Sequence, residues 1–153
     1  MKSRSFCCAL CLFVAFALVS CSLGDISLSP PFLLSAPECV LASETGSFEF
    51  AGVKFSVRNK SSTEIKNISV VFSVYESESG GKPFLWGNSI SSKMECSIES
   101  GECAEFEASL DSYIVQVPEE PYYIDYFYLS SAEFSDGYVW HDPTGAFFVR
   151  GRK

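Results

Sequence analysis

Basic residues and histidine are scarce in this sequence of 153 residues. It contains 11 Lys and Arg against 19 Asp and Glu, a formal net charge of −8, and its one histidine is His141. An acidic surface repels phosphate backbones, so the composition argues against nucleic-acid binding. A catalytic triad needs a histidine beside a nucleophile, and the sequence has no Gly-x-Ser-x-Gly turn. We therefore expect no enzyme, and interpret His141 as a hydrogen-bonding residue at a strand end.

Metal-binding spacing and helical periodicity are also missing. The separation of Cys96 from Cys103 is wider than that of the closely spaced cysteines of a zinc knuckle, so we expect no metal and no cofactor. No apolar stripe at helical spacing extends over more than two turns, and the sequence has no internal repeat. These absences favour a chain built from strands.

The N-terminus carries the pattern of an export signal. Lys2 and Arg4 precede an apolar run over 6–19, which ends in Leu18-Val19-Ser20-Cys21. So short a run barely crosses ~30 Å of hydrocarbon, which favours a signal peptide at residues 1–20 over a spanning helix. The alternative is ordinary secretion, with cleavage after Ala17 and Cys21 left as a free thiol.

The last four of these residues resemble the lipobox of bacterial lipoproteins. The resemblance implies that Cys21 becomes the acylated N-terminus, and that the protein is anchored to a bacterial membrane, periplasmic or surface-exposed. Removal of residues 1–20 leaves 133 residues, with 9 basic and 19 acidic side chains and a net charge of −10. Because no basic face is available, attachment to the membrane must then come from acyl chains. Stable anchoring needs two or more such chains.

Three further cysteines follow Cys21, namely Cys39, Cys96 and Cys103. Cys96 and Cys103 flank Ser100-Gly101, and a hairpin there would bring the two thiols face to face, so we predict a disulfide between them. Cys39 would then be buried or available to a partner. Pairing of Cys39 with either of the others stays open.

Apolar residues alternate with polar ones over most of the chain from residue 48 onward. We expect residues 21–37, which hold the lipidated cysteine and three prolines, to form a tether, followed by a domain over 38–150 and a basic tail at 151–153. The predicted strands are 38–43, 48–57 with a bulge or a break at Ala51-Gly52, a central strand at 68–74, a weak one at 84–90, 94–98, 104–110, 122–131 and 138–140, and residues 146–149 end the domain. Seven or eight short strands with regular turns predict an all-β, immunoglobulin-like β-sandwich.

Three stretches suggest a family. Phe72-Ser73-Val74-Tyr75-Glu76, Val57-Arg58-Asn59-Lys60-Ser61 and Ser100-Gly101-Glu102 resemble the signature stretches of the small FxLYD-like domains of bacteria. The resemblance covers about residues 50–110. It implies an immunoglobulin-like sandwich on an exported, often lipidated protein, and it supplies no catalytic residues.

Aromatic residues are more numerous than one face of a sheet needs to bury. They include Trp86 and Tyr113, and they concentrate at 122–128 and 138–140. From the strand alternation we assign Tyr123, Phe127 and Leu129 to the core. The rings of the opposite phase, with those of the last hairpin, form the predicted binding patch: Tyr122, Tyr126, Tyr128, Tyr138 and Trp140.

Together these patterns predict a membrane-anchored module of the cell envelope that is not an enzyme. Its expected role is to bind a protein partner or to support an assembly. The alternative is a carbohydrate-binding module or an accessory subunit of an envelope hydrolase, which would need coplanar exposed rings beside polar groups.

Overall fold

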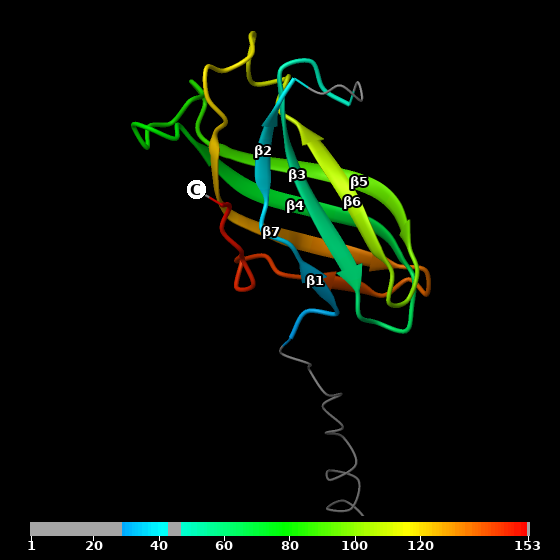
Figure 1. Ribbon diagram of the computed structural model, residues 1–153. Coiled ribbons are helices and arrows are strands. Elements are labelled where there is room, and N and C mark those ends of the chain that lie inside the picture. The colour runs from blue at the N-terminus through cyan, green and yellow to red at the C-terminus, as the bar shows by residue number, and fades with distance from the viewer. Residues whose placement is uncertain (1–28, 43–46, 153) are drawn as a thin grey trace, which may run out of the picture.

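The computed structural model describes residues 29–42 and 47–152, and these form two facing antiparallel sheets (Figure 1). The strands are β1 (Phe32–Leu34), β2 (Glu38–Leu41), β3 (Ala51–Asn59), β4 (Ile65–Tyr75), β5 (Ser89–Ile98), β6 (Cys103–Ser109), β7 (Tyr123–Phe134) and β8 (Val139–His141). The described residues contain eight strands and no helix, so the predicted immunoglobulin-like β-sandwich is confirmed. The predicted signal peptide and Cys21 lie outside the described residues.

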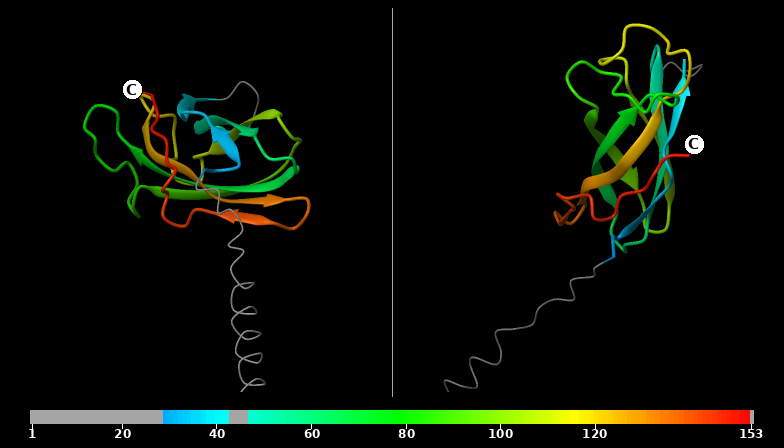
Figure 2. Two further views of the ribbon diagram at one scale, coloured as in Figure 1. Left: turned by 90° about the horizontal axis from the view of Figure 1, so that it is seen from below. Right: turned by 90° about the vertical axis from the view of Figure 1, so that its left-hand side faces the viewer.

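Each sheet is organised around a long strand. In the first sheet β3 pairs with β6 along one edge, while β1 and β2 follow one another along the other edge. The second sheet has the order β5-β4-β7-β8, so the strand predicted to be central, β4, is an inner strand. The views in Figure 2 show the two sheets as separate layers.

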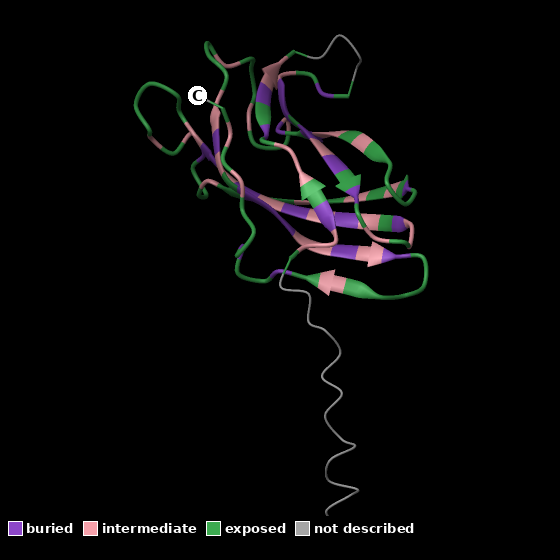
Figure 3. Ribbon diagram, turned by 60° about the horizontal axis from the view of Figure 1, so that its bottom comes forward, coloured by how far each residue is buried: buried purple, intermediate pink, exposed green. Residues whose placement is uncertain are grey.

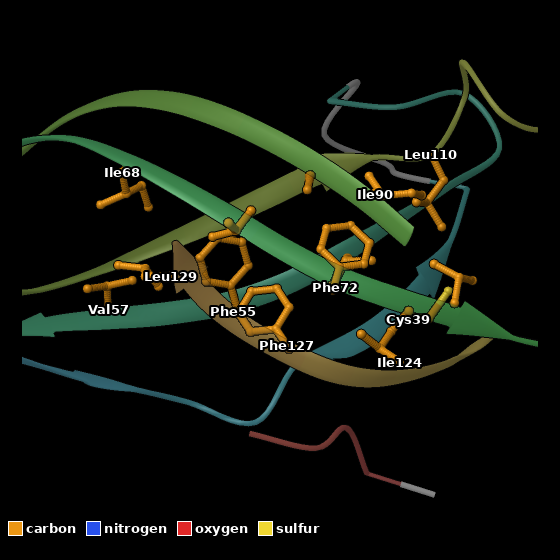
Figure 4. Packing of buried hydrophobic residues seen from close by; sticks show 14 of the residues in the cluster. Cys39, Phe55, Val57, Ile68, Phe72, Ile90, Leu110, Ile124, Phe127 and Leu129 are labelled. Atoms are coloured by element: carbon orange, nitrogen blue, oxygen red, sulfur yellow. The ribbon is translucent and has the colours of Figure 1, made fainter. Parts of the chain in front are cut away.

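The core lies between these layers and is built from alternate residues of the long strands. Figure 4 shows Phe55 of the first sheet against Phe127 of the second, with Phe72 beside them. The ring centroids of Phe55 and Phe127 are 4.8 Å apart, and those of Phe72 and Phe127 are 5.6 Å apart. Large apolar rings at such spacing contribute both buried area and ring contacts, which suits a core only two sheets thick.

The predicted tether is wrong at its C-terminal end. Residues 32–34 form β1, which pairs with the end of β3, and Phe32 is buried with its ring 4.9 Å from that of Trp140. Pro30 and Pro31 restrict the backbone just before β1, but they do not prevent the following apolar residues from pairing. The domain therefore begins about six residues before the predicted boundary at residue 38.

The bulge or break predicted at Ala51-Gly52 is wrong, because both residues pair regularly within β3. The strand begins at Ala51, three residues later than the predicted start at 48. Gly52 is needed because a Cβ there would lie 2.5 Å from the ring of Phe48. Instead of pairing as a strand, the backbone N–H groups of Glu49 and Phe50 donate to the carboxylate of Asp111 at 2.6 and 2.9 Å. The side chain of one residue thus takes the place of a neighbouring strand.

The weak strand predicted over 84–90 also fails. Residues 84–88 form a loop, and β5 begins only at Ser89. The segment is short, follows Pro83 and contains Gly87, so alternation alone could not distinguish it from a packed loop. Residues 146–149, at the end of the predicted domain, contribute a single bridge between Val149 and Phe127.

The predicted hairpin between Cys96 and Cys103 is wrong. Cys96 belongs to β5 in the second sheet and Cys103 to β6 in the first, so the connection at 99–102 crosses between the layers. The thiols of Cys39, Cys96 and Cys103 are all free in the structure, and the predicted Cys96–Cys103 disulfide is not formed. A Gly-containing turn is compatible both with a hairpin within one sheet and with a crossing between two sheets. The sequence alone therefore could not distinguish these two connections.

Two of the stretches that carry the family resemblance meet at the end of the sandwich. The amide Nδ2 of buried Asn59 donates to the carbonyl oxygens of Thr63 and Ile98 at 2.8 and 2.9 Å, and its Oδ1 accepts from Ser61 N at 2.9 Å. The backbone of Asn59 bonds to Gly101 and Glu102. One side chain therefore ties the β3–β4 turn to the β5–β6 crossing.

Asn59→Ala should lower the free energy of unfolding by about 3 kcal/mol, because it leaves several buried polar groups without partners. The matched control is Asn67→Ala, which removes an amide that donates to Glu133 at 3.0 Å on the half-buried outer face of the second sheet. Urea unfolding of both variants measures the difference. Equal losses in the two variants would contradict the central role of Asn59.

Asp111→Asn should destabilise the protein at neutral pH and lose this effect in acid. Desolvation raises the pKa of the Asp111 carboxyl, but the N–H groups of Glu49, Phe50 and Ala51 and the Ser109 hydroxyl outweigh it and hold the pKa below its ordinary value of 3.8. A lowered pKa in the folded state stabilises the protein above the unfolded pKa, and this stabilisation is lost as pH falls through the folded value. Urea titrations at pH 7 and below pH 3.8 test this. A difference from the parent chain that does not change with pH would contradict it.

Candidate functional site

The five residues of the predicted patch do not lie together. Tyr122 lies beside Phe84, 5.9 Å between ring centroids, just before β7 begins. Tyr126 and Tyr128 contact each other on β7, whereas Trp140 of β8 packs against the core. Tyr138 is exposed beside Phe134 at the β7–β8 turn. The predicted patch is therefore corrected to four separate places.

A bulge in β7 explains why the alternation failed. Val71 pairs with Tyr128 and Ser73 with Asp125, so two residues of β7 lie opposite one residue of β4. Tyr126, in the bulge, has a φ of 52°, which a non-glycine residue rarely adopts. Phe127 and Leu129 are buried as predicted, but Tyr128 is also buried, at 8% exposure, while Tyr126 is 40% exposed.

The chain's own C-terminal segment covers the outer rings of β7. Phe148 stacks on Tyr126 at 4.7 Å, and the Tyr126 hydroxyl donates to the carbonyl oxygen of Thr144 at 2.8 Å. The segment is held in place by Asp142, whose carboxylate accepts from Ala146 N and Phe147 N at 2.9 and 3.0 Å. These aromatic rings therefore stabilise the fold, and only part of their surface is available to a ligand.

The most exposed apolar side chains lie elsewhere, on two loops at one end of the sandwich. Trp86 is 98% exposed and Leu85 96%, both in the β4–β5 connection, and Val115 in the β6–β7 connection is 90% exposed. Figure 3 shows most of these connecting loops as exposed ribbon. Together with half-exposed Tyr113 these residues form what we call the apolar tip.

A tight turn presents the first two of these residues to solvent. The N–H of Gly87 donates to the carbonyl of Phe84 at 3.4 Å, which leaves Leu85 and Trp86 as the central residues of the turn. Gly87 has a φ of 115°, a conformation that favours glycine. Central turn positions are usually polar, so two large apolar residues there are unusual.

A groove of about 720 Å³ runs between the two loops. Phe84 is buried and links the groove to the core, with its ring 5.5 Å from Tyr113 and 5.9 Å from Tyr122. The lining contains no charged side chain; its larger members include Pro83, Leu85, Trp86, Ile114, Val115 and Pro118. This composition suits an apolar side chain of a ligand.

A second hollow of about 600 Å³, which we call the acidic furrow, adjoins the groove. Four carboxylates line it, those of Glu76, Glu78, Glu119 and Glu120. Pro118 and Tyr122 line both hollows, so the two adjoin one another.

Two residues that could take part in nucleophile or metal chemistry, Cys39 and His141, differ in their surroundings, because Cys39 is buried and His141 is exposed. Burial raises the pKa of the Cys39 thiol to about 11, so the thiol stays protonated near neutral pH. His141 ends β8 with an exposed side chain. Across 29–42 and 47–152, no group of three or more His, Cys, Asp or Glu side chains is placed to hold a metal ion, and no helix there could span a membrane.

The sequence pattern placed Trp86 and Tyr113 in the aromatic group but not in the predicted patch. It did not indicate that Leu85 and Val115 are exposed. Prediction of a strand over 84–90 hid the turn that exposes Leu85 and Trp86. The useful pattern was the pair Pro83 and Gly87, which brackets a turn.

Comparison of the chain with protein-family models, with curated proteins and with solved structures finds no match.

Proposed function

We propose that this protein is a lipid-anchored module of the bacterial cell envelope that binds a protein partner through its apolar tip and carries out no reaction. The observation that carries the proposal is the near-complete exposure of Leu85, Trp86 and Val115 on adjoining loops. Burying an exposed side chain of this size contributes about 1.5–3 kcal/mol, so a partner that covered all three would gain considerably.

The residue types of the apolar tip favour a protein partner over a sugar. Trp and Tyr are the residues that most often dominate the energetics of protein contacts, and Trp86 and Tyr113 both line the groove. A sugar site needs coplanar exposed rings beside hydrogen-bonding groups. The best-stacked rings of the outer face, Tyr126 and Phe148, lie on one another instead.

The position of the apolar tip suits a module attached at its N-terminus. In Figures 1 and 2, β1 lies at one end of the sandwich, and the β4–β5 and β6–β7 loops lie toward the other. An anchor on Cys21 would join the domain just before β1, so the apolar tip would face away from the membrane. The lipobox-like Leu18-Val19-Ser20-Cys21 and the resemblance to FxLYD-like domains support the anchor.

Cys21→Ser should abolish labelling by a fatty-acid analogue and move the protein from the membrane to the soluble fraction, because the substitution removes the thiol that would be acylated. Metabolic labelling followed by fractionation measures both effects. The matched control is Cys103→Ser, which removes an exposed thiol of β6 and should change neither. Labelling that persists without Cys21 would rule out this anchor.

A photo-crosslinking residue at position 86 should capture a defined envelope protein, and Leu85→Ser should reduce the yield about tenfold, as expected for a contact residue. The melting temperature should stay within a degree or so, because Leu85 is exposed.

The control for this experiment is Leu33→Ser, which changes an exposed leucine of β1 at the other end of the sandwich. It should leave the cross-link intact. Phe84→Ala should instead lower stability by about 3–5 kcal/mol, because it removes a buried ring. Equal cross-linking in the Leu85 and Leu33 variants and the parent chain would contradict the assignment of the apolar tip.

A further inference from the structure

We propose that the segment recognised by the apolar tip is basic and amphipathic, with a large apolar side chain in the groove and neighbouring Lys or Arg side chains over the acidic furrow. This inference rests on the proposed function and specifies the chemistry of the partner. The observation behind it is that the groove and the acidic furrow adjoin one another and share Pro118 and Tyr122.

The carboxylates of the acidic furrow take no part in the ion pairs between described residues. The ion pairs of the described chain are Lys54 with Glu107, Lys66 with Glu64 and Arg150 with Asp125, and none of them involves the furrow. One cation lies close by: Arg152 lines an adjoining cavity that also includes Glu76 and Glu120 of the furrow. The furrow's other two glutamates, Glu78 and Glu119, do not line that cavity, so negative charge remains beside the uncharged groove.

This arrangement favours a partner of positive charge. Complementary charge speeds association and excludes partners of like charge, while buried apolar side chains slow dissociation. A basic segment without apolar residues would leave the groove unfilled. An acidic amphipathic segment would place like charges against Glu119 and Glu120.

Two other occupants fit less well. A second copy of this chain would bring its own acidic furrow and a net charge of −8 against the first. A bilayer would accept Trp86 and Leu85, but the furrow would lie against the head groups, where anionic lipids repel it. We therefore commit to a basic amphipathic peptide segment.

Fluorescence of Trp86 provides a direct test, because the chain has 2 tryptophans. In the Trp140→Phe background the emission reports the apolar tip alone. The full chain, purified from the envelope and held in phosphatidylcholine nanodiscs, is titrated with a short tryptophan-free peptide of leucine and lysine arranged to be amphipathic. A peptide with glutamate in place of lysine is the matched ligand control.

The lysine peptide should shift the Trp86 emission to shorter wavelength in a saturable way, and the glutamate peptide should not. Leu85→Ser, and separately Glu119→Gln with Glu120→Gln, should each weaken binding by about tenfold or more. Glu95→Gln with Glu105→Gln removes the same charge from exposed positions of β5 and β6 and should leave binding unchanged.

Several results would overturn the inference. They are equal shifts with the two peptides, no shift with either, or equal weakening by both pairs of glutamate substitutions. A blue-shifted emission in the nanodisc alone, relative to the Cys21→Ser chain in solution, would assign the apolar tip to lipid. If the cross-link from position 86 to an envelope protein persists in any of these cases, the proposed function stands and only the basic partner is wrong.

Discussion

The contact of Phe55 with Phe127 between the two sheets is the interaction on which the rest of the structure depends. Phe127 lies directly after the bulge at Tyr126, which shifts the register of β7 against β4, so that Ile124 before the bulge and Phe127 after it both face the core. Tyr128 lies on the outer face, where the C-terminal segment covers it. The sheet therefore has a second, smaller layer of packing on its outer side.

Polar side chains hold the backbone in place at the ends of the sandwich. Asn59 closes one crossing between the layers, and Asp111 takes the place of a strand for the backbone at 49–51. Buried backbone groups must find partners, and these two side chains supply them where no neighbouring strand is available. With the ends held in this way, the β4–β5 and β6–β7 loops can present apolar residues without contributing to the core.

Alternation of apolar and polar residues was sufficient to predict the sandwich, the central position of β4 and most of the strands. It failed at Phe32, at Tyr128 and at the connection between Cys96 and Cys103. Each failure has the same origin, since pairing partners and bulges depend on residues far away in the sequence. The candidate site suffered most, because Leu85 and Trp86 look like part of a strand until the turn at Gly87 is seen.

The sequence by itself determined the all-β class and the acidic character of the chain, and its N-terminal pattern predicts export and acylation at Cys21. Composition and the spacing of apolar residues follow from the sequence alone, without knowledge of which segments pack against each other. Only the tertiary structure decided which rings are covered, that Cys96 and Cys103 belong to different sheets, and that an uncharged groove adjoins four glutamates. Exposure depends on what folds against a residue, and the covering segments lie many positions away: Phe148 covers Tyr126, whereas nothing in the described chain covers Trp86.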